Sequence, residues 1–310
     1  MKLATVEHDR AERTALVLDQ GERLLLLDRA HRLVTGEHAP TLTTMQTIID
    51  GGEPVRQTLE RLAAQAPPEA VVAASDLRWL SPLPRPVQIR DFGSFMDHFR
   101  NARSRIQGIP ADQVELPAIM LERPLYYVTN RLSVTGHDSD IHWPAYSSVR
   151  DYELEFACVL GRDGTDIPAA DAQSHIFGYT IFNDFSARDT QLEEIATGLG
   201  LSKSKDFTDS NVLGPWIVTA DELGDPYRLT MTARINGEEA SRGTSADRHH
   251  TFADMIAFAS QSTRLHAGEV LCSGTVPTGC GLEHGRFLEP GDTVELEVSG
   301  LGVLRNRVVS

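Results

Sequence analysis

Apolar and polar residues follow two different periods in the first 80 residues of the chain. The segment 15–27, Ala-Leu-Val-Leu-Asp-Gln-Gly-Glu-Arg-Leu-Leu-Leu-Leu, predicts two short strands on either side of a Gln-Gly turn. Between 54 and 64, apolar residues recur at helical spacing, and Pro67-Pro68 ends that helix. The run Ser-Pro-Leu-Pro-Arg-Pro at 81–86 is stiff and extended. We therefore predict a small N-terminal α/β domain at 1–80 and a linker at 81–90.

Strand patterns dominate the chain after the linker. The run 230–235 leads into Asn236-Gly237, a pair that accommodates the positive φ angles of a type I′ hairpin turn. One clear helix interrupts the strands, and its start carries a capping box, Thr-x-x-Asp, at 251–254. Many strands, few helices and regular turns indicate a β-rich, rolled or barrel-like domain at 91–310.

Acidic residues interrupt two of the apolar runs. Glu153 and Glu155 lie two apart in Glu-Leu-Glu-Phe-Ala-Cys-Val-Leu, and side chains two apart on a strand share a face. Two like charges on one apolar face repel and are costly to bury, and a hard divalent cation with oxygen ligands removes that cost. Asp184 follows a second apolar run, 176–182, and is a natural third ligand. The alternative is that these acids are solvated residues of a strand edge.

A series of short motifs carries a resemblance to a known family. The motifs are Asp151-Tyr-Glu-Leu-Glu155, Phe177-Gly-Tyr-Thr-Ile-Phe-Asn-Asp-Phe-Ser-Ala-Arg-Asp189, Leu213-Gly-Pro-Trp-Ile-Val-Thr219, Ser273-Gly-Thr275, Pro290-Gly-Asp292 and the tail from Gly300 to Arg307. In this order and spacing, from about Asp91 to the C-terminus, they resemble the fumarylacetoacetate hydrolase family. The resemblance implies an α+β, β-rich fold in which a mixed β-roll forms the catalytic domain, and it implies a homodimer.

The resemblance also implies a set of metal ligands. Glu153, Glu155 and Asp184 match the family's metal-binding acids, and Asp97 in Ser94-Phe-Met-Asp-His-Phe99 aligns with a fourth ligand of the eukaryotic-type members. A shell made only of carboxylates suits Mg²⁺, Mn²⁺ or Ca²⁺ and disfavours zinc, which prefers nitrogen and sulfur ligands.

Further residues match the family's substrate pocket. Lys205, with Lys203 as the alternative register, matches a lysine that stabilises enolate charge, and Glu283 matches an acid that orients water in the hydrolases. The residues expected to contact the substrate are Tyr127, Gln191 and Thr275.

The expected general base is His98, but its carboxylate partner is missing from the sequence pattern. Many bacterial-type members carry a His-x-x-Glu dyad, and this chain has His98-Phe-Arg-Asn101. Eukaryotic-type members place a histidine seven residues after the aspartate that matches Asp97, and here that position is Ser104. His98 therefore works alone or with Glu283, and a glutamate at position 101 is expected to support it. The other possibility is a histidine without a catalytic role.

Composition excludes several other functions. The formal charge of −15 argues against nucleic acid and anionic membrane as partners, because both require basic patches. No run of apolar residues is long enough to span a membrane, and the N-terminus lacks an apolar signal core. Cys158, Cys272 and Cys280 have no metal-binding spacing and are interpreted as reduced thiols, which points to the cytoplasm.

These observations favour a divalent-metal-dependent hydrolase that cleaves a C–C bond in a small, acidic β-dicarbonyl or 2-oxo acid. The alternative is a decarboxylase, isomerase or hydratase that acts through a metal-bound enolate, because the fold and the metal site do not fix the reaction. A second alternative is a non-catalytic binding member that kept the metal and lost the base.

Overall fold

The computed structural model describes residues 1–310, and its largest feature is a mixed twelve-stranded sheet that runs through the whole molecule. Ten of its strands form the path β4-β3-β2-β1-β14-β12-β11-β17-β6-β7, and β5 and β8 pair at its side. Their bounds are β1 Lys2–His8, β2 Ala11–Leu18, β3 Arg23–Leu26, β4 Val71–Ala73, β5 Arg78–Trp79, β6 Ile89–Phe92, β7 Tyr126–Thr129, β8 Val134–Thr135, β11 Leu154–Leu160, β12 Ile176–Asp184, β14 Asn211–Thr219 and β17 Val270–Cys272.

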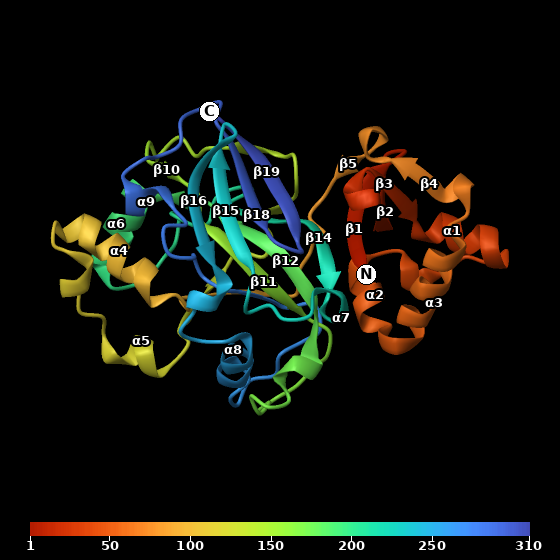
Figure 1. Cartoon of the computed structure of the whole chain (residues 1–310), viewed down its shortest axis with the longest axis horizontal. Coiled ribbons are helices and arrows are strands. Elements are labelled where there is room, and N and C mark those ends of the chain that lie inside the picture. Colours follow the sequence, from red (N-terminus) through yellow and green to blue (C-terminus); the bar gives the residue numbers. More distant parts are fainter.

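The N-terminal residues extend this sheet instead of forming a detached unit. β2 and β3 flank the predicted Gln-Gly turn, and β1 pairs with β14 so that Leu3 lies opposite Ile217. The predicted helix is α3, Gly52–Gln65, and it packs beside α1, Leu27–Thr35, and α2, Met45–Asp50. These helices cover the sheet at one end of the molecule (Figure 1). β6 already begins inside the segment predicted as a linker.

A second sheet of five strands packs on the large one. Its order is β16-β15-β18-β19-β9, with bounds β9 Asp140–His142, β15 Thr230–Ile235, β16 Glu238–Thr244, β18 Thr293–Val298 and β19 Gly302–Val309. The predicted hairpin is confirmed, because Asn236 and Gly237 connect β15 to β16 with φ angles of 54° and 81°. The two sheets remain separate and do not close into a barrel, and the core lies between them.

The predicted capping box also forms, at the start of α8, Phe252–Ala259. The Thr251 side chain accepts a hydrogen bond from the Asp254 amide, and the Asp254 carboxylate accepts one from the Thr251 amide. Phe252 then packs against Phe156 of β11, with ring centroids 5.1 Å apart. This contact fixes one face of the strand that carries the acidic residues.

The remaining helices were not predicted from the periodicity. They are α4 Met96–Gln107, α5 Ala118–Glu122, α6 Arg188–Thr197, α7 Ala220–Leu223 and α9 Gly281–His284, and a small two-stranded sheet pairs β10 Arg150–Asp151 with β13 Ser186–Ala187. α4, α5, α6 and α9 gather at the end of the molecule away from the N-terminal helices (Figure 1). None of the helices has the length and apolar character needed to cross a membrane. All three cysteines are free thiols.

Candidate functional site

Four buried carboxylates converge where three strands of the large sheet begin or end. Asp91 lies near the end of β6, and Asp184 ends β12. Glu153 comes directly before β11, and Glu155 is the second residue of that strand. β12 pairs directly with β11, and β6 reaches the same edge through β17, where Cys272 lies opposite Asp91. The strand order therefore brings together acids that are far apart in the sequence.

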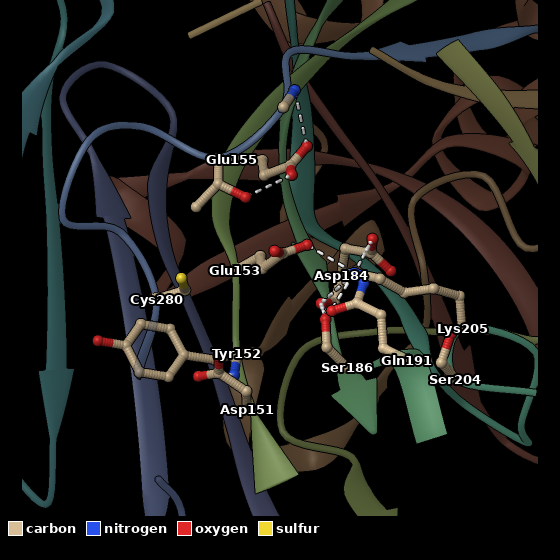
Figure 2. Close-up of polar contacts among 12 residues, drawn as sticks. Asp151, Tyr152, Glu153, Glu155, Asp184, Ser186, Gln191, Ser204, Lys205 and Cys280 are labelled. Carbon is tan, nitrogen blue, oxygen red and sulfur yellow. Dashed lines mark hydrogen bonds and ion pairs between the residues drawn. The ribbon is translucent and has the colours of Figure 1, made fainter. Parts of the chain in front are cut away.

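Two buried cations balance part of this charge. The Lys205 ammonium lies 2.6 Å from a Glu153 oxygen and also contacts Asp184 (Figure 2). The Arg188 guanidinium lies 2.7 Å from the other Glu153 oxygen. Burial raises the pKa of Glu153, but Arg188 and Lys205 outweigh burial and leave it lowered. Burial lowers the pKa of Lys205, but Asp184 and Glu153 outweigh burial and leave it raised. Glu153 is thus an ionised carboxylate held between two cations.

Asp91 and Glu155 have no such cationic partner. Burial is the main reason that the pKa of Asp91 is raised well above its usual value, and the negative charge of Asp184 is the second. Burial is likewise the main reason that the pKa of Glu155 is raised well above its usual value, and the negative charge of Asp91 is the second. One oxygen of Asp91 and one of Asp184 are buried without a hydrogen-bond partner. This excess of buried carboxylate oxygen fits a hard divalent cation, which would supply the missing positive charge and use the unpaired oxygens.

A histidine–carboxylate pair lies beside the acidic cluster, close enough for His98 to lower the pKa of Glu153, and it comes from two other elements. His98, buried on α4, places Nδ1 2.7 Å from an oxygen of Glu283 on α9. The second Glu283 oxygen accepts hydrogen bonds of 2.8 Å from the Asn101 side chain and from the Thr278 amide. Burial raises the pKa of Glu283, but its contacts with His98 and Asn101 outweigh burial and lower it. His98 therefore has an ionised partner, supplied by α9 rather than by its own helix.

Comparison with known proteins identifies the family. The model of the fumarylacetoacetate (FAA) hydrolase C-terminal domain matches residues 88–309. The chain belongs to this family. It is 33% identical over 275 residues to the human mitochondrial oxaloacetate tautomerase FAHD2A, covering 87% of this chain and 81% of that protein. It is 34% identical over 190 residues to the oxaloacetate tautomerase YisK of Bacillus subtilis strain 168, covering 60% of this chain and 62% of that protein.

Solved structures of the family share the fold. Fumarylacetoacetate hydrolase from Exiguobacterium antarcticum superposes with a TM-score of 0.76 at 24% identity and covers 100% of this chain and 99% of its own. Maleylpyruvate hydrolase from Sphingobium sp. SYK-6, solved with manganese(II) and pyruvate, gives a TM-score of 0.75 at 20% identity, with coverage of 100% and 99%. The strand-rich α+β fold predicted from the motifs is confirmed. The cytoplasmic location stays a prediction, and the human relative is named as a mitochondrial protein.

Asp97, predicted as the fourth metal ligand, lies outside the acidic cluster of this family member. Its side chain is 65% exposed and pairs with Arg100 one turn along α4, whereas Asp91 is 5% exposed. The reason is position: Asp97 lies in the first turn of α4 and faces outward, and Asp91 lies in a buried strand. Counted from Asp91, the histidine seven residues later is His98. Asp91 therefore fits the spacing of the eukaryotic-type members and replaces Asp97 as the candidate fourth ligand.

The structure places the other predicted residues around the acidic cluster. Lys205 is the lysine in the cluster, since the Lys203 ammonium bonds the Asp206 carbonyl at the surface. Tyr127 donates a hydrogen bond to Asp184, and Thr275 donates one of 3.2 Å to Glu155. Gln191 accepts a hydrogen bond of 2.8 Å from Arg188. All of these side chains contact a carboxylate of the cluster or a cation that pairs with one.

Sequence reasoning missed Asp91, and it gave Arg188 no role in the site. Arg188 donates hydrogen bonds of 2.7 Å to Asp151 and to Glu153. Asp189 accepts hydrogen bonds from Ser147 and Ser148. The local pattern carries no signal for Asp91, because β6 has the sequence Ile-Arg-Asp-Phe and contains no apolar run for an acid to interrupt.

The reassignment from Asp97 to Asp91 predicts different metal contents for two isosteric variants. Asp91→Asn removes a buried charge from the donor set, so the purified protein should lose its divalent metal after desalting. Asp97→Asn changes only an exposed helix residue and should retain wild-type metal content. Elemental analysis of both proteins decides the assignment. Metal retained in the Asp91 variant and lost in the Asp97 variant would restore the original alignment.

Proposed function

We propose that this protein is a divalent-metal-dependent enzyme that catalyses the keto–enol tautomerisation of a small 2-oxo diacid of the oxaloacetate type. The observation that carries the proposal is the buried His98–Glu283 pair facing the carboxylate cluster. The relatives named as oxaloacetate tautomerases support the reaction class. The site residues are nearly all buried, which suits a small substrate.

The acidic cluster would hold the metal and bind the oxygen atoms of the substrate. Asp91, Glu153, Glu155 and Asp184 supply the ligand oxygens, and the cation would act as a Lewis acid toward the 2-oxo and carboxylate oxygens. Lys205 adds a fixed positive charge that stabilises the negative charge developing on the enolate oxygen.

The proton transfer belongs to His98. Its Nδ1 is engaged with Glu283, so an Nδ1–H tautomer leaves the Nε2 lone pair free to accept a proton. Nε2 takes the proton from the carbon next to the 2-oxo group, and the resulting imidazolium gives a proton to the enolate oxygen, which completes the enol. In the reverse direction Nε2 takes the proton from the enol oxygen and returns it to the carbon. Glu283 holds the ring in place and stabilises the imidazolium that forms in between. Asn101 and the Thr278 amide hold the carboxylate in that orientation.

C–C bond hydrolysis is the second candidate. The same observation favours it, because a histidine paired with a carboxylate can also deprotonate a water that attacks a carbonyl. The main reason to doubt hydrolysis was an incomplete dyad, and Glu283 supplies the missing carboxylate. A complete pair also counts against the non-catalytic alternative.

A parallel substrate assay tests the proposal. With Mg²⁺ or Mn²⁺ present, the protein should accelerate the decay of enol-oxaloacetate to its keto form, followed by ultraviolet absorbance. Acylpyruvates should remain intact under the same conditions. Release of pyruvate from acylpyruvates without tautomerase activity would support the hydrolase, and no turnover of either substrate would overturn both candidates.

Substitutions at His98 and Asn101 test the base and its support. His98→Ala should lower kcat by about 10²–10⁴-fold while the protein keeps its metal. Asn101→Glu should also lower kcat, because it places a second carboxylate against Glu283 and repels the group that it was expected to assist. Arg100→Gln on the exposed side of the same helix is the matched control and should keep wild-type kcat. Near-native turnover in His98→Ala would remove this histidine from the chemistry.

A further inference from the structure

A second group of metal-ligating side chains lies beside the acidic cluster and differs from it in chemistry. His98, Cys280 and Glu283 each offer one ligand atom, and these atoms all lie within 4.8 Å of one another. The set contains nitrogen, sulfur and one carboxylate oxygen, whereas the acidic cluster offers only oxygen. Nitrogen and sulfur ligands select zinc and its softer relatives over magnesium.

We propose that His98, Cys280 and Glu283 form an inhibitory site for a thiophilic divalent cation such as Zn²⁺ or Cd²⁺. The site is distinct from the hard-metal cluster, and its occupation blocks the histidine that moves the proton. Metal binding at these residues does not depend on the proposed function. Only the loss of turnover depends on it.

The backbone holds the thiol in place for this role. Cys280 forms an antiparallel bridge with Glu153, so the loop before α9 lies directly against the strand that carries the acids (Figure 2). The Cys280 sulfur lies 3.5 Å from the same Glu283 oxygen that contacts His98. Two of the three ligands, from separate segments of the chain, therefore already contact the same oxygen of the third.

The coordination step balances in charge and protons. The Cys280 thiol loses its proton to solvent, and the resulting thiolate and the Glu283 carboxylate neutralise the two charges of the cation. His98 Nδ1 contributes its lone pair as a neutral ligand, and water completes a tetrahedral shell. The cation takes the place of the proton between His98 and Glu283, which are 2.7 Å apart, and the neutral imidazole then carries its proton on Nε2 after exchange with solvent. Because Nε2 is protonated and Nδ1 is coordinated, His98 cannot accept the proton of the substrate, and proton transfer stops.

Cadmium titration of the magnesium-saturated 310-residue protein tests the site directly. The wild type should bind one Cd²⁺ with a thiolate-to-cadmium absorption band, and activity should fall in step with the band. Cys280→Ala should lose the band and need at least about tenfold more Zn²⁺ for half inhibition, because even outer-shell changes cost about 10–100-fold in metal affinity. Its activity in Mg²⁺ alone should match the wild type. Cys158→Ala, which removes another buried thiol, is the matched control and should behave as the wild type.

The outcomes distinguish a failure of the proposed metal site from a failure of the proposed catalytic role of His98. A band that persists in Cys280→Ala overturns the site and assigns the thiolate to Cys158 or Cys272. Wild-type inhibition by Zn²⁺ in that variant also overturns the site and assigns the inhibitory cation to the acidic cluster. A band that requires Cys280 without any loss of turnover overturns the inhibitory role and counts against His98 as the base. If Cys280→Ala does not fold, Cys280→Ser keeps the side-chain size, lacks a thiolate and gives the same readout.

Discussion

The rest of the site depends on an imbalance of buried charge. Asp91, Glu153, Glu155 and Asp184 are buried together, and only Lys205 and Arg188 oppose them within the cluster. Arg188 is shared with a fifth buried carboxylate, that of Asp151. Buried like charges raise one another's pKa values and destabilise the folded state unless a counterion is present. A protein retains such an arrangement where a cation belongs, and the unpaired oxygens of Asp91 and Asp184 are where that cation would bind.

Hydrogen bonds around the cluster hold this arrangement in place. Asp151 accepts hydrogen bonds from the amides of Gly281 and Leu282 and also pairs with Arg188. It therefore connects the start of α9 to the arginine that contacts Glu153. These contacts hold the start of α9, the helix from which Glu283 reaches His98. One hydrogen-bond network through Asp151 and Arg188 thus connects the acidic cluster to the helix that carries Glu283.

Sequence reasoning found the parts of the site that local pattern determines. Glu153, Glu155 and Asp184 interrupt apolar strands, and the hairpin at Asn236-Gly237 and the cap at Thr251 are local signals that the structure reproduces. Asp97 was chosen as a ligand by aligning a short motif, and the sequence does not show that Asp97 is exposed and Asp91 buried. The His98–Glu283 pair joins residues 185 positions apart, and no periodicity encodes such a contact. Asn101 occupies the position of the glutamate in the His-x-x-Glu dyad. In the fold its side chain donates a hydrogen bond to Glu283, which takes over the role of that glutamate.

The central claim is that the buried carboxylates require a cation, and the thermal stability of Glu155→Gln tests it most directly. Without metal, the variant should be at least as stable as the wild type, because a buried like charge is removed. With Mn²⁺ at about a hundredfold excess over its Kd, the wild type should gain about 2.7 kcal/mol and the variant should gain almost nothing. An equal gain from Mn²⁺ in both proteins would contradict the account.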